Sequence, residues 1–600
     1  MNLLNRKHHL WDAAVIFFIA FGLRLAFELY LRQHYPFYDY PSDDVGYYRQ
    51  WAQDISRRSF IGNETFWGLP LYPYFLALLD RWFFGNAFLI RVFHLFLGSL
   101  NCVFIYAITN AVFSRSVALT AGILTAVSFT CVYYDWLMMP PLLLIFLAGI
   151  IVLTLLHKDQ LKTKRQWVYL GLLLGIAMLG DGKFLFLFVF ICLYELKTHQ
   201  KECKAITTNV LLPLLIGMIT ILFLSGLRNK LVGGDWVWIS AQSGLTLYSG
   251  NNPQAKGYYE HMEDFRPTHF HQDIDQILVA EKELGRPLTP AQVSQFYRNK
   301  AVQFIVQQPA AFTKLLLRKL HLFLIESENT FDMDLIFLRD LRNRLDINPF
   351  ALIGPLAILG MLVTRKAGHG KVYLYLLIAS QLALVLVFYM LDRYRASILP
   401  FLIIFEAAAL LWLAEQIKQK QILKLIFAVL FVLGFTVFFQ RKPLDAASVE
   451  FLKQSKLGYA YEKEGKLPQA QKAYLTALSI RPNDTNAFFN LGNTYVAQNN
   501  LAMAKKCYER VLHHMPHHVD AIFNLAHVEE NLGNPAAAKQ KYAQVLELTP
   551  QSIDALYLLG TLYLKEQRCE QALSYFHQII QLNPAYAQEI KSLMESCLSP

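Results

Sequence analysis

Long apolar segments are the feature that most constrains the fold of this chain. Between residues 10 and 440, about eleven of them approach the length needed to cross about 30 Å of hydrocarbon. Two are short, so the predicted number is open by one or two. The segments cover residues 10–30, 87–113, 116–134, 137–157, 166–181, 184–196, 207–227, 350–364, 372–391, 396–415 and 421–439. We therefore predict an all-α chain whose residues 1–440 form a polytopic helical membrane domain.

The composition agrees with a membrane protein and argues against several soluble classes. Of the 600 residues, 54% are hydrophobic and only 17% are charged, which is too apolar for an ordinary soluble enzyme. The formal net charge is +11, but the basic residues gather in short segments between apolar runs, as the positive-inside rule requires. Membrane topology explains the basicity, and we predict no nucleic-acid partner.

The basic connections also predict which segments share a side of the membrane. Four of them fall at every second boundary: KDQLKTKRQ (158–166), KTHQKECK (197–204), RKAGHGK (365–371) and EQIKQKQ (415–421). We place these and the N-terminus in the cytoplasm, in a multi-pass protein of a bacterial inner membrane, with a retained first span. The other connections then face outward: 31–86, Tyr133–Pro141, Asp181–Lys183, 228–349 and Asp392–Arg395.

The C-terminal part, residues 441–600, is polar and periodic. Four sets of residues recur every 34 positions: Pro482, Pro516, Pro550 and Pro584; Gly458, Gly492, Ala526 and Gly560; Ala470, Ala504, Ala538 and Ala572; Tyr474, Tyr508, Tyr542 and Phe576. Small residues let two helices approach, an aromatic ring fills the gap, and a proline ends the second helix. This pattern predicts about four tetratricopeptide repeats with a groove for a partner protein. An odd number of spans places them outside the cytoplasm.

Two adjacent carboxylates stand just beyond the first predicted span. They are Asp43 and Asp44 in PSDDVGYYRQWAQDI (41–55). Acids at the start of a helix satisfy free backbone N–H groups and the helix dipole, and this structural explanation stays open. The next stretch, GNETFWGLPLYPYFLALLDRWFF (62–84), is too interrupted to span and predicts a helix at the membrane interface.

Three stretches together resemble a known family. They are the acid pair with its tyrosine-rich helix and GLPLYPYFLAL, then LRNKLVGGDWVWISAQSGLTLYSGNNPQAKGYY (227–259), then DRYRASILPFL (392–402). In this order they resemble the GT-C membrane glycosyltransferases, specifically the protein O-mannosyltransferase and aminoarabinose transferase group (glycosyltransferase family 39). The resemblance implies sugar transfer from a polyprenyl-phosphate donor to a protein or envelope-glycan acceptor on the outer face of the membrane.

Such a reaction needs a carboxylate that takes the acceptor proton and cations that hold the leaving phosphate. Asp43 or Asp44 is the predicted base, with a slight preference for Asp44 from the Tyr48–Trp51 register, and the other acid orients the acceptor or a basic neighbour. The predicted phosphate-binding cations are Arg393, Arg395, Lys183 and Arg228. For each cation the alternative is an interfacial anchor at the end of a span.

Further polar residues are weaker candidates for contacts with sugar or acceptor. These are Tyr48, Asn251, Asn252, Glu326 and Glu328. The asparagines lie in a turn-rich stretch, so ordinary loop architecture is the alternative for them. Related transferases often carry an acid near the outer start of the fourth span. Here only Asp135 is nearby, displaced by a few residues, so a second acidic site is in doubt.

No metal site or cofactor is predicted, and dependence on a divalent metal is left open. The histidines of residues 261–271 and of HHMPHH (513–518) lack a carboxylate or cysteine partner at a suitable spacing. Two other functions compete with an enzyme: a tetratricopeptide membrane scaffold for envelope assembly, and a transporter or flippase. A transporter would use ionisable residues near the middle of spans. Arg91 and His94 are such residues, and no role is assigned to them. The sequence does not identify the sugar or the acceptor.

Overall fold

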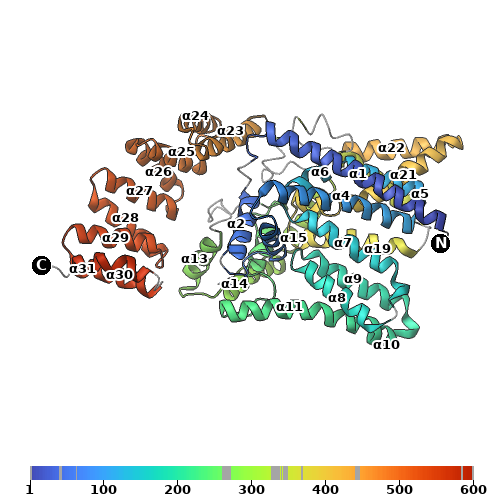
Figure 1. Cartoon of the computed structure of the whole chain (residues 1–600), viewed down its shortest axis with the longest axis horizontal. Coiled ribbons are helices and arrows are strands. Elements are labelled where there is room, and N and C mark those ends of the chain that lie inside the picture. The colour runs from blue at the N-terminus through green and yellow to red at the C-terminus, as the bar shows by residue number, and fades with distance from the viewer. Residues whose placement is uncertain are drawn as a thin grey trace. The chain divides into compact units, whose positions relative to one another are not determined.

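The computed structural model shows an all-helical chain, which confirms the predicted fold class (Figure 1). It describes residues 3–38, 43–57, 59–62, 64–161, 163–259, 272–325, 338, 341, 349–365, 369–438, 446–582 and 586–597. The chain divides into two compact units, Met1–Pro443 and Leu444–Pro600, which we call the membrane unit and the repeat unit.

The membrane unit is built from long apolar helices joined by shorter ones. Its described α-helices are α1 (Leu3–His34), α2 (Asp43–Arg57), α3 (Leu71–Trp82), α4 (Ala87–Val112), α5 (Arg115–Val127), α6 (Phe129–Trp136), α7 (Pro141–Leu156), α8 (Lys164–Met178), α9 (Lys183–Thr198), α10 (Cys203–Ile206), α11 (Leu212–Gly233), α12 (Ser243–Gly250), α13 (Gln272–Leu284), α14 (Pro290–Gln307), α15 (Pro309–Leu324), α18 (Phe350–Val363), α19 (Val372–Val387), α20 (Asp392–Ala396), α21 (Leu399–Lys418) and α22 (Ile422–Phe438). Each predicted apolar segment falls on one or two of these helices.

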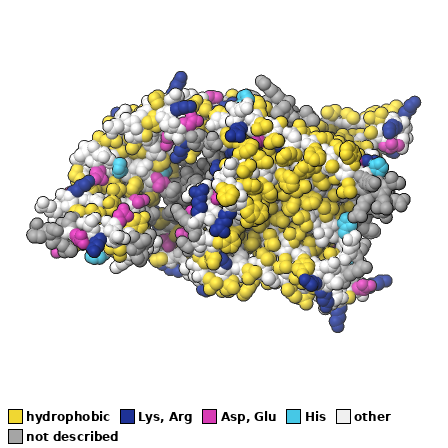
Figure 2. Space-filling model, in the orientation of Figure 1, with side chains coloured by type: hydrophobic (Ala, Val, Ile, Leu, Met, Phe, Trp, Pro, Cys, Tyr) yellow, Lys and Arg dark blue, Asp and Glu magenta, His cyan; other side chains and the backbone are white. Residues whose placement is uncertain are grey.

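Several of these helices suit a bilayer. In the described part of the chain, four are long and apolar enough to cross one: His8–His34, Ala87–Val112, Gln200–Gly233 and Leu399–Lys418. A further pair, α5 and α6, passes together but bends by 56°, and α7, α18, α19 and α22 are shorter apolar helices. Hydrophobic side chains form a broad surface over the membrane unit (Figure 2). The chain is a multi-pass membrane protein, and the predicted number of about eleven spans stays a prediction.

Three of the connections that the charge pattern assigned to the cytoplasm lie close together. The Lys158 ammonium is 2.8 Å from the Glu195 carboxylate, and the Tyr373 hydroxyl donates to the same carboxylate at 2.7 Å. His199 is 3.6 Å from Glu195. These residues lie within or beside the connections 158–166, 197–204 and 365–371. The charge pattern thus grouped segments that the fold brings to one end of the bundle.

A buried ion pair fixes the bent helices α5 and α6 against α1. Arg24 Nε donates to Asp135 Oδ2 at 2.8 Å, and Arg24 Nη1 donates to the carbonyl of Ala126 at 3.1 Å, close to the bend. The side chains are 0% and 5% exposed. Gly98 is required for this approach, because a Cβ there would lie 2.3 Å from Asp135 Oδ2. The predicted segment 116–134 is therefore a broken helix held by charge.

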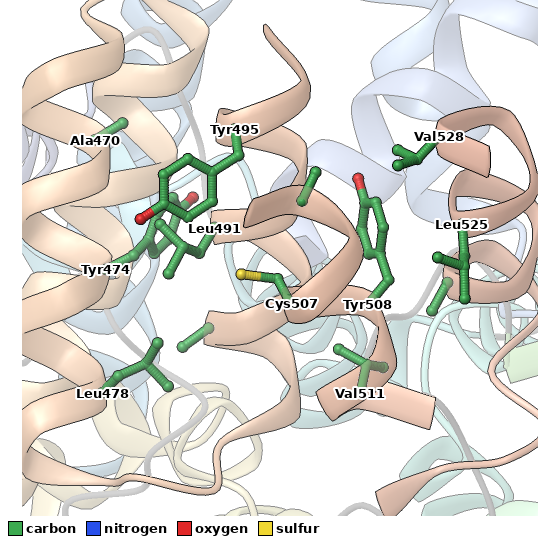
Figure 3. Close-up of a cluster of buried hydrophobic side chains, with 13 residues drawn as sticks. Ala470, Tyr474, Leu478, Leu491, Tyr495, Cys507, Tyr508, Val511, Leu525 and Val528 are labelled. Atoms are coloured by element: carbon green, nitrogen blue, oxygen red, sulfur yellow. The ribbon is translucent and has the colours of Figure 1, made fainter. Parts of the chain in front are cut away.

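The repeat unit consists of successive antiparallel helix pairs and a last helix. They are α23 (Ala446–Lys463), α24 (Leu467–Ile480), α25 (Thr485–Ala497), α26 (Leu501–His514), α27 (Val519–Asn531), α28 (Pro535–Leu548), α29 (Ile553–Lys565), α30 (Cys569–Leu582) and α31 (Ala587–Ser596). In Figure 3, the rings of Tyr474, Tyr495 and Tyr508 lie between neighbouring helices. A Cβ on Gly492 would lie 2.7 Å from the Tyr508 ring, so the ring packs on bare backbone. The interpretation of the 34-residue pattern is confirmed.

Candidate functional site

A cavity of about 690 Å³ lies in the membrane unit. Each of the five segments that the sequence assigned to the outer side contributes to its wall. Representative lining residues, one from each segment in chain order, are Asp44, Tyr134, Asp181, Gln242 and Arg393. Helix α9 runs from this cavity to Glu195, which contacts Lys158 and Tyr373. The cavity and the Glu195 contacts therefore lie at opposite ends of the helix bundle. The fold thus gathers these five segments around one space.

An ion pair between Asp44 and Arg393 stands in the cavity wall. Arg393 Nη1 donates to Asp44 Oδ2, and the two side chains are 24% and 25% exposed for Asp44 and Arg393 respectively. Asp44 is the second residue of α2, and Arg393 belongs to α20, 349 residues further along the chain. Burial opposes the charge of Arg393, but the Asp44 carboxylate and the neighbouring tyrosines together outweigh it, so the pKa of Arg393 lies well above its usual value. Two predicted site residues are therefore in direct contact.

Tyr48 lies one helical turn after Asp44 and also lines the cavity. Its ring centroid is 5.4 Å from that of Tyr72 in an edge-to-face arrangement. Burial raises the pKa of Tyr48 to about 12, with the charge of Asp44 adding to the rise and that of Arg393 opposing it. The phenol stays protonated near neutral pH and can donate a hydrogen bond into the cavity. Asp43 begins the same helix, but its side chain lies outside the described residues, so its role stays a prediction.

Lys183 is fully buried beside the cavity instead of lining it. Its ammonium donates to Ser397 Oγ at 2.6 Å and is 3.4 Å from Asp181 Oδ2. The backbone N–H of Lys183 donates to Asp181 Oδ1 at 2.8 Å. Asp181 itself lines the cavity. Lys183 thus ties the start of α9 to the segment between α20 and α21, and it positions Asp181 in the wall.

Arg395 and Arg228 are likewise held by protein acceptors. Arg395 Nη2 donates to Asp392 Oδ1 at 2.8 Å, and its guanidinium lies 4.2 Å above the Phe350 ring. Arg228 donates to the carbonyls of Ile61 at 2.7 Å and Glu64 at 2.5 Å. Neither residue is among the described residues that line the cavity. Their predicted contact with phosphate stays a prediction, and in this structure they hold loops in place.

The two predicted asparagines shape the turn after α12. The side-chain amide of Asn251 donates to the carbonyls of Leu247 and Val387, both at 2.8 Å, and its Oδ1 accepts from Lys319 Nζ at 2.9 Å. Asn252 Oδ1 accepts from the backbone N–H of Gln254 at 2.8 Å. Both asparagines are buried and serve local architecture. Glu326 and Glu328 lie outside the described residues.

Other lining residues were not singled out from the sequence. Arg298 of α14 is exposed and supplies a second cation to the wall. Trp236 and Trp238 are about half exposed, at 46% and 53%, with ring centroids 5.7 Å apart. The alternating tryptophans of GGDWVW are a signal for paired rings on one side of an extended segment. An exposed arginine on a helix carries no comparable signal. Asp135, the acid near the fourth predicted span, forms an ion pair with Arg24.

The described residues of the membrane unit offer no cluster of metal ligands, and Arg91 and His94 pack within the helix bundle. No three His, Cys, Asp or Glu side chains gather to hold a metal ion in the part of the chain that the structure describes, and metal dependence stays open. The Arg91 guanidinium lies 3.9 Å from the centre of the Tyr38 ring and donates to the Tyr38 carbonyl at 2.7 Å. His94 is fully buried and stacks against Phe75 at 5.9 Å. Both residues pack within the bundle.

Comparison with known families divides the chain in the same way. Residues 68–227 match the family model described as dolichyl-phosphate-mannose-protein mannosyltransferase. Tetratricopeptide repeat models match residues 458–499, 489–553 and 531–597. The first match contains Asp181 and Lys183 but ends short of Asp44 on one side and Arg393 on the other. No curated protein matches the chain.

Solved structures similar to this chain cover a part of it. A crystal structure of MamA protein is 19% identical, with a TM-score of 0.23, and the match covers 25% of this chain and 86% of that one. YrrB, titled a tetratricopeptide protein with an unusual peptide-binding site, is 19% identical with a TM-score of 0.22, covering 30% and 88%. Pseudomonas aeruginosa pilF is 16% identical with a TM-score of 0.22, covering 31% and 84%.

The family matches confirm the resemblance first seen in the sequence. The membrane unit carries a segment similar to mannosyltransferases, and the repeat unit carries the matched repeats. Residues 68–227 are thus similar to a family of GT-C membrane mannosyltransferases, and residues 458–597 carry tetratricopeptide repeats.

Proposed function

We propose that the membrane unit transfers a sugar from a polyprenyl-phosphate donor to a protein or envelope-glycan acceptor. The transfer takes place on the outer face of a bacterial inner membrane. The observation that carries this proposal is the Asp44–Arg393 pair in a cavity walled by all five segments assigned to the outer side. The description of the matched family, which names a lipid-phosphate mannose and a protein, supports a donor and acceptor of this kind.

In the proposed reaction the acceptor oxygen or nitrogen attacks the anomeric carbon of the sugar. The bond between that carbon and the phosphate oxygen breaks, and polyprenyl phosphate leaves. Asp44 takes the acceptor proton as the new bond forms, which is general-base catalysis of an inverting transfer. Arg393 donates to the phosphate oxygens as their negative charge grows. Tyr48 can donate a further hydrogen bond, and Asp43 is the alternative base.

The repeat unit, in this proposal, recruits the acceptor or an assembly partner through its groove. Tetratricopeptide arrays present a curved surface of side chains from successive helix pairs, which suits an extended peptide or a protein surface. A membrane enzyme with a protein acceptor gains from such a surface, because binding away from the cavity raises the local concentration of the acceptor.

Mass spectrometry of glycoproteins and envelope glycans tests the proposal. A deletion strain would be complemented with wild type, Asp43→Asn, Asp44→Asn or the double variant. Loss of the same mass in the deletion and Asp44→Asn strains, with retention in Asp43→Asn, is the expected result. It would identify the sugar, the acceptor and the base together.

A control variant distinguishes chemistry from folding. Asp54→Asn changes a carboxylate on the same helix α2 that does not line the cavity, and it should keep the modification. All variants should reach wild-type levels in the membrane fraction. Unchanged glycosylation in the Asp43/Asp44 double variant would rule out the mechanism.

A further inference from the structure

Two side chains with different proposed roles form a hydrogen-bonded ion pair in the cavity wall. Asp44 is the proposed base, and Arg393 is the proposed phosphate ligand, yet Arg393 Nη1 donates directly to Asp44 Oδ2. A guanidinium offers the same planar set of N–H donors to a carboxylate and to a phosphate. The Asp44 carboxylate therefore takes up a donor position on Arg393 that phosphate oxygens would use.

We infer that Asp44 competes with the donor phosphate for Arg393, so that binding of the donor releases the base. This inference rests on the proposed function. A carboxylate held in an ion pair is stabilised in its charged form and is a poor proton acceptor. When the guanidinium turns toward phosphate, Asp44 Oδ2 loses the hydrogen bond from Arg393, and the carboxylate becomes a better proton acceptor. The chain then activates its base only when a donor is present.

The geometry of this pair suits an exchange of partners. Its side chains are 24% and 25% exposed, whereas those of the Arg24–Asp135 pair are 5% for the acid and 0% for the arginine. Water can therefore reach the cavity pair, and breaking it costs far less than breaking a fully desolvated pair. Of these two ion pairs, a ligand can reach Asp44–Arg393 but not Arg24–Asp135.

The backbone around Arg393 is held by other contacts. Two residues further on, Arg395 is bonded to Asp392 and packs on Phe350. The N–H of Ser397 donates to the carbonyl of Arg393 at 3.3 Å. Because these contacts fix helix α20, the Arg393 side chain can change its partner while the backbone stays in place. Tyr48, one helical turn after Asp44, lines the same wall.

Competition makes a prediction that simple base catalysis does not. Replacing Asp44 by Asn removes the competing charge, so Arg393 should bind a phosphate more tightly, by roughly two- to fivefold for a partly exposed pair. The same substitution should abolish transfer, because an amide cannot take the proton. A base that does not compete with the donor would lose activity with no gain in phosphate affinity.

The test measures binding of polyprenyl phosphate to the purified full chain in lipid nanodiscs. The variants are Asp44→Asn, Arg393→Gln, their combination, and Asp54→Asn. We expect tighter binding by Asp44→Asn, weaker binding by Arg393→Gln, and no further effect of Asp44→Asn in the Arg393→Gln background. Asp54→Asn is the matched control, since it removes an acid from the same helix α2 at a residue that does not line the cavity. It should bind as wild type does.

Three results would overturn the inference. The first is unchanged affinity in Asp44→Asn. The second is an equal gain with and without Arg393, or in Asp54→Asn, which would indicate a general effect of removing a negative charge. The third is no measurable binding by any variant. The proposed function fails on a separate readout, namely glycosylation that persists in the Asp43/Asp44 double variant.

Discussion

The two units of this chain use charge in opposite ways. In the membrane unit, Arg24, Lys183 and Lys319 are fully buried, and each bonds to a partner far away in the sequence. In the repeat unit, lysines form ion pairs near the surface, as Lys565 does with Glu530 at 2.8 Å. Its core is instead aromatic rings packed on small residues. Long-range charge contacts position the cavity, and short-range packing builds the array.

The largest effect should come from breaking a buried charge pair. Arg24→Ala leaves Asp135 without its cation in a dry interior, and we expect the membrane unit to lose about 3–5 kcal/mol of stability. Thiol labelling during a temperature ramp can follow this in the full chain, because Cys102 is fully buried in the membrane unit. Cys507, buried in the repeat unit, serves as the control and should label as in wild type. A Cys102 labelling temperature equal to that of wild type would show that the pair contributes little.

A smaller effect is expected from overpacking the repeat unit. Gly492→Val places a branched side chain against the Tyr508 ring, where even a Cβ would lie 2.7 Å away. Strain of this kind costs about 1–3 kcal/mol. Gly492→Ala should cost less, because Ala526 holds the same register against Tyr542 in the next repeat. The labelling temperature of Cys507 should fall in this order, and that of Cys102 should stay constant.

Lys319 of the membrane unit should make the stability of that unit depend on pH. Burial lowers the pKa of Lys319 from 10.5 to about 7. Between these values the unfolded chain binds the extra proton, so the stability of the native state rises with pH across this window. Lys319→Met removes the group. The labelling temperature of Cys102 should therefore rise less in this variant than in wild type between pH 7 and 9.

A matched control for this prediction lies on the neighbouring helix α14. Lys300 pairs with Glu283 at 2.8 Å near the surface. Lys300→Met should keep the pH dependence of wild type. If Lys319→Met also keeps it, the amine of Lys319 titrates at an ordinary pH despite its burial.

The smallest effect is expected from a surface pair of the repeat unit. Lys565 is 67% exposed, and its partner Glu530 is 20% exposed. Exposed ion pairs contribute less than about 1 kcal/mol. Lys565→Ala should shift the Cys507 labelling temperature only slightly, and the shift should shrink further in high salt. A shift as large as that of Gly492→Val would contradict the comparison between the two units.

The repeat unit could be predicted in detail because its contacts are local. Gly492 and Tyr508 meet within one repeat, so the same spacing recurs and is visible in the sequence. The grouping of the five segments assigned to the outer side was also predictable, because basic connections mark alternate boundaries. Both patterns repeat along the chain, and repetition is what sequence reasoning detects most easily.

The contacts of the cavity were less accessible from the sequence. Asp44 and Arg393 were chosen for their chemistry, but their pairing joins residues 349 positions apart. Lys183 donates to Ser397, and Arg228 donates to backbone carbonyls, while their predicted contact with phosphate stays a prediction. No sequence pattern shows which hydroxyl or backbone carbonyl will accept such a hydrogen bond. Arg298 looks like any exposed arginine on a helix until the fold places it in the wall.

The 34-residue spacing of the repeats has a consequence for how this gene can change. Each helix pair contacts its neighbours, α24 with α25 and α26 with α27, while α31 covers the last pair through Ile590. In-frame duplication of 34 codons inside the array therefore adds one complete pair and leaves the ends unaltered. The array can lengthen during evolution by one helix pair at a time, without any change to the residues that form the cavity.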